Sequence, residues 1–229
     1  ACTPPFDPWL AHTVRIVDIT DEIADVATYH LEFVDSVIGK SFTFRPGQFN
    51  MLYLPGVGEA AISISSDSAQ RGTLDHTVRI AGNVTGELAR SGDGETFGLR
   101  GPFGSAWPIE EALGGDVVIV TGGIGIAPLR PAIYELLNRK DEFGNLSLLY
   151  GARNPFGMLY TNEYDDWERR GLNVTTTVDR ASPGWDGNVG VVPQLLDRMP
   201  LSDPANTTVK CCGPEVMMWY TVRSALGRG

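Results

Sequence analysis

The sequence predicts two domains of different classes, an antiparallel β-barrel followed by an α/β domain with a parallel sheet. Up to about Pro108 the chain consists of short runs rich in β-branched and aromatic residues, separated by turns such as Arg45-Pro46-Gly47. From Gly114 onward, strand-like runs alternate with helix-like runs, which is typical of βαβ units. A chain of 229 residues is long enough for two small domains.

The first domain is expected to span residues 6–110. Its strands are expected at residues 14–19, 27–33, 49–54, 61–65, 74–80 and 96–99, and this spacing favours a small antiparallel barrel. One short helix is expected in this part, at residues 85–90, directly after Gly82-Asn83-Val84.

The second domain is expected to span residues 114–229. Its strands are expected at residues 117–120, 146–150, 174–178 and 208–212. Each strand is followed by a helix-like stretch, at 129–139, 162–170, 192–197 and 215–226. This alternation predicts a parallel sheet covered by helices.

Composition narrows the function classes. A net charge of −10 argues against a nucleic-acid partner, because no basic patch is available to replace counterions. No apolar run approaches the ~20 residues that span a bilayer, so we expect no membrane insertion and a cytoplasmic location. The three histidines show no metal-ligand spacing, and we expect them to be surface or strand residues and no metal site to be present.

The strand at 116–120 leads directly into Thr121-Gly122-Gly123-Ile124-Gly125-Ile126-Ala127-Pro128, after which a helix is expected. Glycine lets backbone N–H groups approach an anion, and a helix start adds a favourable dipole. Gly123 and Gly125 match the first two positions of G-x-G-x-x-G, whereas the third is Pro128, expected in the first helical turn. The motif therefore predicts a nucleotide-binding site, and a Rossmann dehydrogenase is the weaker interpretation. A plain glycine-rich turn without a ligand stays the open alternative.

Residues just past the expected parallel strands should share one crevice, because ligands bind beyond the carboxyl ends of such strands. These residues are Gly122 to Gly125, Gly151-Ala152-Arg153, Asp179-Arg180 and Cys212-Gly213-Pro214. We expect the binding site of the second domain in this crevice.

The chain resembles the ferredoxin–NADP reductase family in the order of its features: a barrel, then Gly-Gly-x-Gly-x-x-Pro, then Cys-Gly-Pro. Within it, the chain is most similar to the FAD/NAD(P)-binding gamma subunits of cytoplasmic NiFe hydrogenases (sulfhydrogenases). Further matching segments are Phe44-Arg45-Pro46-Gly47-Gln48-Phe49, Pro55 to Ile64, Gly82-Asn83-Val84-Thr85, Gly101-Pro102-Phe103-Gly104, Tyr150-Gly151-Ala152-Arg153 and Val178-Asp179-Arg180. The number and order of these segments make the resemblance specific.

The resemblance implies a ferredoxin reductase-like fold with a flavin-binding barrel and an NAD(P)-binding domain. The implied cofactors are FAD and NAD(H) or NADP(H), with electrons passing on to iron–sulfur partners in a redox complex, expected to be a hydrogenase. An electron-transfer subunit of dihydroorotate dehydrogenase, a freestanding NAD(P)H-flavin or ferredoxin reductase, and a non-catalytic docking subunit remain open.

The family's [2Fe-2S] cluster needs a further strand and a four-cysteine segment. The three cysteines of this chain, Cys2, Cys211 and Cys212, cannot ligate such a cluster. We therefore expect that the sequence is truncated.

The family's Arg-x-Tyr-Ser flavin strand falls on Ala60, Ala61, Ile62 and Ser63. Ser63 is kept and is implied to lie near flavin N5 as a catalytic residue, whereas Ala60 replaces the phosphate-binding Arg and Ile62 the stacking aromatic. Val84 and Thr85 match the segment that caps the pyrophosphate. The rest of the implied flavin site consists of Val78, Arg79, Ile80 and Gly82, with Arg79 as a candidate replacement cation.

In the second domain, Gly122, Gly123 and Gly125 are implied to hold the dinucleotide pyrophosphate. Arg153, Asp179 and Arg180 lie where the family recognises the adenosine ribose. A carboxylate suits NAD and an arginine suits NADP, so the preference stays open with a lean to NAD. Cys212 is implied to be a catalytic residue beside the nicotinamide, where Gly213 and Pro214 keep side chains away.

Overall fold

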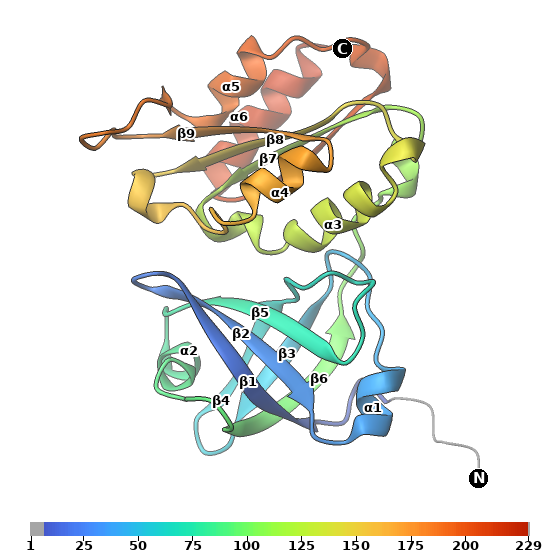
Figure 1. Cartoon of the computed structure of the whole chain (residues 1–229), viewed down its shortest axis with the longest axis vertical. Helices are drawn as coiled ribbons and strands as arrows, with labels where there is room; N and C mark the ends of the chain where they lie inside the picture. Colours follow the sequence, from blue (N-terminus) through green and yellow to red (C-terminus); the bar gives the residue numbers. More distant parts are fainter. Residues whose placement is uncertain (1–6, 229) are drawn as a thin grey trace. The chain divides into compact units, whose positions relative to one another are not determined.

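The computed structural model describes residues 7–228, which form two compact units (Figure 1). The first unit runs to Trp107 and includes Arg130–Ala132. The second comprises Pro108–Leu129 and the chain from Ile133 onward. Phe6 and Gly229, the expected ends of the two domains, lie outside the described residues, as does Cys2.

The first unit is built on one antiparallel sheet of six strands within residues 7–107, in the order β4-β3-β6-β1-β2-β5. The strands are β1 (His12–Ile23), β2 (Val26–Phe33), β3 (Phe49–Leu54), β4 (Gly58–Ser63), β5 (Thr73–Arg79) and β6 (Thr96–Phe103). The chain just after β4 also meets β5, where Ser65 N–H donates to the Asp75 carbonyl at 2.8 Å. The two end strands of the sheet are thereby joined, and the predicted barrel class is confirmed.

The barrel core follows from the two-residue period of its strands. Alternate residues of one strand point to the same face, so Val14 and Ile16 of β1 and Leu99 of β6 are buried together. The residues that alternate with them along each strand point to the outer surface of the barrel. Strand positions in this unit could therefore be predicted from local pattern.

Three local features of the first unit differ from the prediction. Helix α1 (Ser36–Ser41) was not expected; its N-cap Asp35 accepts N–H bonds from Val37 and Ile38. Helix α2 (Asn83–Leu88) starts two residues earlier than expected. Strand β4 begins at Gly58 because the turn after Leu54 sets the register Leu54–Gly58 with β3, whereas Ile64 and Ser65 have left β4.

The second unit contains a parallel sheet in the order β10-β9-β8-β7-β11. Its strands are β7 (Asp116–Gly122), β8 (Leu146–Ala152), β9 (Leu172–Val178), β10 (Asn188–Val189) and β11 (Thr207–Cys212). The helices in this part of the chain are α3 (Arg130–Asn138), whose residues Arg130–Ala132 belong to the first unit, α4 (Tyr164–Arg169), α5 (Val192–Arg198) and α6 (Glu215–Leu226). Turns of 3₁₀ helix occupy Glu110–Ala112, Gly123–Ile126, Lys140–Glu142, Pro155–Gly157 and Pro204–Asn206. The fold class of this part is confirmed.

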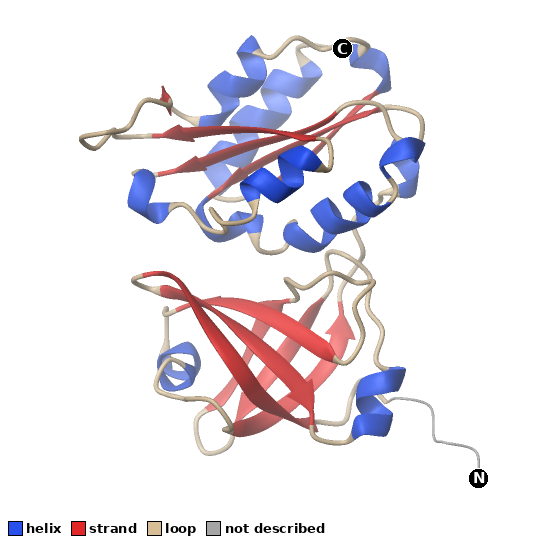
Figure 2. Cartoon of the chain, viewed as in Figure 1, coloured by secondary structure: helices blue, strands red, loops and turns tan. Residues whose placement is uncertain are grey.

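Helices lie on both faces of this sheet, with α5 and α6 on one face and α4 on the other (Figure 2). All seven residues of β8 are buried, which is typical of a central parallel strand covered on both sides. The two-residue strand β10 was not expected, since so short a segment shows no periodicity. Across residues 7–228, none of the helices has the length and apolar character required to cross a bilayer.

Leu99→Ala should destabilise the barrel. Leu99 is 0% exposed in the barrel core. Its truncation is expected to lower the free energy of unfolding by about 2–5 kcal/mol, from lost burial and the cavity left behind. Urea titration measures this change. Val17→Ala on β1, where Val17 is 38% exposed, is the control and should cost less than about 1 kcal/mol. Equal losses in the two variants would contradict the assignment of the core.

Candidate functional site

The carboxyl ends of the parallel strands meet at one edge of the second unit's sheet. The register places Gly122 beside Gly151, Thr121 beside Cys212 and Ala152 beside Val178. The segments that follow β7, β8, β9 and β11 therefore start at the same edge of the sheet. The sequence predicts this arrangement, with the candidate residues in one crevice. The structure brings together the candidate residues of this unit.

Glycines at this edge let two loops pack closely. A Cβ on Gly125 would lie 2.5 Å from the Cys212 carbonyl oxygen, and one on Gly122 would lie 2.9 Å from Met217 Sδ. Gly123 has a φ of 56°, a conformation that favours glycine. The Thr121 hydroxyl donates to the Cys212 carbonyl at 2.8 Å. Gly122 and Gly125 are thus needed for packing against Cys212-Gly213-Pro214, a role that the motif alone did not reveal.

Pro128 lies before α3, and its expected place in the first helical turn is wrong. The glycine segment Gly123–Ile126 forms a 3₁₀ turn, and α3 begins only at Arg130. Pro131 occupies the first turn of α3, where its missing N–H has no intrahelical partner to lose. The extra 3₁₀ turn separates the glycines from the helix.

Tyr150 is a site residue that the sequence did not single out. Its buried hydroxyl donates to the Gly123 carbonyl at 3.1 Å and accepts the Leu159 N–H at 3.1 Å. The hydroxyl therefore ties the glycine turn after β7 to the chain after β8. The available signal was an aromatic residue directly before Gly151 at the end of a strand.

Cys212 lies at the end of β11 and is partly buried. Burial, and to a smaller extent the neighbouring Cys211, raises the pKa of the Cys212 thiol. Cys212 is therefore a neutral thiol at pH 7. The next residue, Gly213, has a φ of 157° and would place a Cβ 2.7 Å from Met217 Cε. Pro214 then caps α6, so glycine and proline together end β11 and start the last helix.

Arg153, Asp179 and Arg180 lie side by side beyond β8 and β9. Asp179 N–H donates to the Ala152 carbonyl and Arg180 N–H to the Arg153 carbonyl, each at 3.0 Å. All three side chains are exposed, and within the described part of the chain none of them forms an ion pair within 4.0 Å. Their charges are available to a ligand that approaches from solvent.

In the first unit, the candidate residues Ala60, Ala61, Ile62 and Ser63 occupy β4 at one end of the sheet. Ala61 is exposed, whereas Ile62 packs partly against the barrel core. The hydroxyl of Ser63 makes no hydrogen bond to any residue in the described range 7–228. A ligand beside β4 would meet small side chains and one hydroxyl without an internal partner.

Near β4, the segment that includes α2 contains the other candidates. The Thr85 hydroxyl accepts the N–H groups of Ala81 and Gly82 at 2.9 and 3.1 Å, which holds the turn before α2. Space is open where a Cβ on Gly82 would project. Val84 lies 3.4 Å from the position of a Cβ on Gly58 of β4, so α2 approaches this strand.

Three consecutive candidates lie at the end of β5 and just beyond it, and they differ in how much of their side chains a ligand could contact. Val78 is 3% exposed in the barrel core, so only its backbone could meet a ligand. Arg79 is half-exposed and pairs with Asp25 at 3.4 Å, and Ile80 is exposed. Arg79 is the one cation among these three residues.

His76 is a strand residue of β5, one of the two settings expected for it, and its side chain is fully buried. Its Nδ1–H donates to the Ser63 carbonyl at 3.0 Å, and its Nε2 accepts the Asn50 side-chain N–H at 3.1 Å. Burial lowers the pKa of His76 to about 4, so the imidazole is neutral at pH 7. No sequence signal for this contact exists, because Asn50 and Ser63 lie 26 and 13 residues away.

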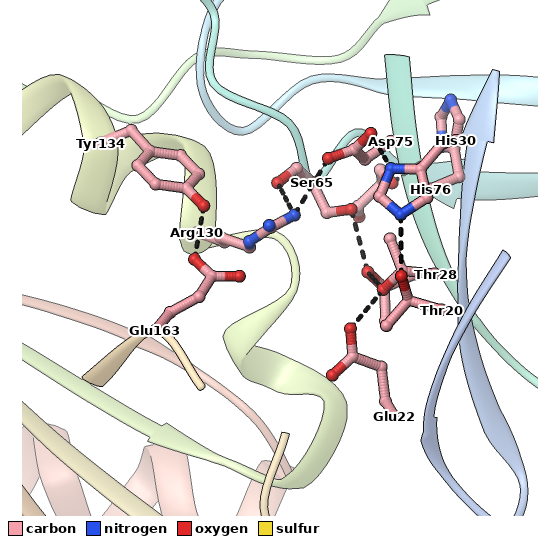
Figure 3. Close-up of polar contacts among 12 residues, drawn as sticks. Thr20, Glu22, Thr28, His30, Ser65, Asp75, His76, Arg130, Tyr134 and Glu163 are labelled. Atoms are coloured by element: carbon pink, nitrogen blue, oxygen red, sulfur yellow. Dashed lines mark hydrogen bonds and ion pairs between the residues drawn. The ribbon is translucent and has the colours of Figure 1, made fainter. Parts of the chain in front are cut away.

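Asp75 and Thr77, the neighbours of His76 in β5, both bind Ser65, just after β4. Figure 3 shows Asp75 with Ser65, His30 and Arg130. The Asp75 carboxylate binds His30 Nδ1 at 2.8 Å and Arg130 at 3.2 Å, and Arg130 also donates to the Ser65 carbonyl at 3.0 Å. Thr77 and Ser65 share a hydrogen bond of 2.9 Å between their hydroxyls. Three consecutive residues of β5 therefore hold the chain that follows β4.

The charges in this cluster shift each other's pKa. Burial acts to raise the pKa of Asp75, but the hydrogen bond and charge of His30, together with Arg130, lower it overall. The hydrogen bond to Asp75 is the largest of the effects that raise the pKa of His30. The Asp75 carboxylate is therefore ionised at pH 7, between partners that stabilise its charge.

Comparison with known proteins shows which family this chain is similar to. The family model described as the oxidoreductase NAD-binding domain matches residues 119–223. The gamma subunit of sulfhydrogenase 1 from Pyrococcus furiosus is 31% identical over 227 residues, which cover 97% of this chain and 77% of the relative. The probable dihydroorotate dehydrogenase B (NAD(+)) electron transfer subunit of Methanocella arvoryzae is 34% identical and covers 93% of this chain, and 72% of that relative is matched. A ferredoxin NADP+ reductase from Neisseria gonorrhoeae with bound FAD and NADP has the same fold, with a TM-score of 0.81, 21% identity, and coverage of 96% of this chain and 92% of that chain.

The buried His76 should make stability fall as the pH is lowered. Its pKa is about 4 in the folded state and ordinarily near 6.5, so below pH 6.5 the unfolded chain binds the proton first. We expect this residue to remove about 3 kcal/mol of stability between pH 6.5 and 4. Urea titration of wild type and His76→Asn at several pH values measures the difference, because His30 and Asp75 titrate in both proteins. Identical pH profiles would contradict a buried neutral imidazole.

Proposed function

The chain belongs to the ferredoxin–NADP reductase-like family, and on that premise we propose that it passes electrons between NAD(P)H and FAD and on to iron–sulfur partners. One observation carries the proposal within this chain. The glycine turn after β7 packs against Cys212-Gly213-Pro214 at the carboxyl edge of the parallel sheet. This edge is where open α/β sheets bind dinucleotides.

The residues of the first unit fit a flavin. Ser63 presents a hydroxyl without a partner among residues 7–228, on a strand whose other candidates, Ala60 and Ala61, leave room beside the backbone. Gly82 leaves open space at the turn that Thr85 holds, and α2 approaches β4 through Val84. A pyrophosphate bound at this turn would meet backbone N–H groups. Arg79, the last residue of β5 just before the turn, would supply a positive charge.

The second unit fits a pyridine dinucleotide. Gly122, Gly123 and Gly125 would hold the pyrophosphate at the end of β7. The exposed Asp179 would accept the 2′-hydroxyl of an adenosine ribose, whereas Arg153 and Arg180 would accept a 2′-phosphate. We favour NAD(H), because Asp179 follows β9 directly, at the acidic position expected for a free hydroxyl.

When bound, the two cofactors supply hydride transfer between nicotinamide and flavin, and the protein supplies orientation. Cys212 would lie against the nicotinamide as a neutral thiol, which excludes water without placing a charge there. Gly213, which has no side chain, would leave space for the nicotinamide next to Cys212. Ser63 would place its hydroxyl near flavin N5.

We propose that the partners are other subunits of a redox complex in the cytoplasm, a NiFe hydrogenase in the first instance. The two relatives described above carry names of complex subunits, one a gamma subunit and one an electron transfer subunit. The three cysteines of this chain are fewer than the four thiolates of a typical [2Fe-2S] cluster, so the onward iron–sulfur carrier lies outside these residues. A dihydroorotate dehydrogenase is the second candidate complex, favoured by the 34% identity to its electron transfer subunit.

A visible spectrum of the purified chain tests the proposed function. We expect a flavin absorption band after reconstitution with FAD, and bleaching of this band when NADH is added without oxygen. A chain that binds neither cofactor would overturn the proposal and leave a docking subunit. Co-purification with hydrogenase subunits or with dihydroorotate dehydrogenase then distinguishes the two complexes.

Cys212→Ala should slow flavin reduction. Loss of the thiol beside the nicotinamide is expected to lower the stopped-flow rate of flavin reduction by about tenfold, the size of one weakened contact in the transition state. Cys211→Ala is the matched control, because Cys211 packs against the core on the other side of β11. Equal rates in Cys212→Ala and wild type would contradict the role of Cys212.

Asp179→Ala should weaken the preference for NADH over NADPH. Removal of the acceptor for the ribose 2′-hydroxyl is expected to raise the KM for NADH about fivefold and to lower that for NADPH. Asp165→Ala removes an exposed carboxylate from α4 and controls for the change in net charge. If both variants shift the two KM values alike, the effect is one of general charge and the role of Asp179 is wrong.

A further inference from the structure

We infer that His76 is a positioning residue of the flavin site, which holds the peptide unit between Ser63 and Ile64 in place. The inference rests on the proposed function, because Ser63 is the residue proposed to lie near flavin N5. His76 itself is 0% exposed and cannot touch a ligand beside β4. Its effect must therefore pass through the backbone of Ser63.

The peptide unit that follows Ser63 is held at both of its polar groups. His76 Nδ1–H donates to the Ser63 carbonyl at 3.0 Å, and the Ile64 N–H donates to the Gln48 carbonyl at 3.1 Å. The carbonyl of Ser63 and the N–H of Ile64 belong to one planar unit. Two partners at opposite ends of this unit fix its rotation, and with it the direction in which the Ser63 side chain leaves the strand.

The imidazole of His76 is itself held at Nε2, the ring nitrogen that does not face Ser63. The Asn50 side chain donates to Nε2 at 3.1 Å, which leaves Nδ1 as the nitrogen that carries the proton. Asn50 is fully buried, and its Oδ1 fills the space beside Gly101, where a Cβ would lie only 2.3 Å away, so the glycine is what makes room for the amide behind His76. Asn50, His76 and the Ser63 carbonyl thus form one buried chain of hydrogen bonds.

The charged groups nearby leave this chain neutral. Asp75, next to His76 on β5, directs its carboxylate to His30 and Arg130. Burial keeps the imidazole of His76 unprotonated at pH 7. A neutral donor fits a position behind a flavin strand, because it fixes the carbonyl without adding a charge to the environment of the ring.

Two substitutions separate the two hydrogen bonds of His76. His76→Asn places an amide where Nδ1 was and keeps a donor for the Ser63 carbonyl. His76→Gln places an amide where Nε2 was, so it keeps a partner for Asn50 and loses the donor for Ser63. Thr77→Val is the control: it removes the hydroxyl contacts with Ser65 and Thr28 and leaves both hydrogen bonds of the Ser63–Ile64 peptide unit in place.

The experiment uses the full chain, with and without FAD, and three readouts. They are the hydrogen-exchange rate of the Ile64 amide in the apoprotein, the flavin midpoint potential, and the stopped-flow rate of flavin reduction by NADH. We expect His76→Gln to speed Ile64 exchange, shift the potential and slow reduction about fivefold, the size of one lost hydrogen bond. His76→Asn should stay within about twofold of wild type, and Thr77→Val should change stability alone.

The outcomes that overturn the inference are distinct from failure of the proposed function. If wild type binds FAD and is reduced by NADH, but both His76 variants match it in exchange, potential and rate, His76 does not position Ser63. Equal damage in His76→Asn and His76→Gln overturns the inference as well. Should His76→Gln fail to fold, ¹⁵N NMR of wild type decides, because an Nε2–H tautomer would exclude the bond to Ser63. A wild type that binds no FAD overturns the proposed function itself.

Discussion

The closure of the barrel behind β4 is the constraint on which the rest of the first unit depends. An open antiparallel sheet exposes unpaired N–H and C=O groups at both ends, and closure removes these edges. In this barrel the chain leaves its partner β3 after Ser63 and meets β5 at Ser65, whose N–H binds the Asp75 carbonyl. Because the candidate flavin strand ends where the barrel closes, the contacts that close the sheet also set the position of Ser63.

Most buried polar groups at this closure are tolerated because they have hydrogen-bond partners, whereas Asn50 Oδ1 and Ser66 Oγ have none among residues 7–228. Burial acts to raise the pKa of Asp75, but the hydrogen bonds and charges of His30 and Arg130 lower it overall. His76, next to it, is neutral because burial lowers its pKa more than the Ser63 carbonyl and the Asp75 charge raise it. One position therefore carries a stabilised charge and the next a neutral donor, and this difference suits His76 to hold a backbone carbonyl.

In the second unit, the glycines serve packing, and we propose that they also bind a ligand. Gly125 and Gly122 have no space for a side chain, since the Cys212 carbonyl and Met217 occupy it. The same absence of a side chain exposes backbone N–H groups to an anion. Packing thus requires glycine at these positions, and the proposed pyrophosphate site would require it again beside Cys212, where we propose that the nicotinamide binds.

Local patterns in the sequence determined the barrel and the parallel sheet, because the two-residue period of strands such as β1 and β6 and the alternation after Gly114 depend on neighbouring residues alone. The glycine turn and Cys212-Gly213-Pro214 could also be identified, as could their meeting at one sheet edge, since parallel strands align their carboxyl ends. Only the tertiary structure decided that β4 ends at Ser63, that a 3₁₀ turn separates Gly125 from α3, and that His76 is buried against Ser63 and Asn50. These features depend on contacts between residues far apart in the chain, whose energies exceed local preference, and no short sequence pattern records them.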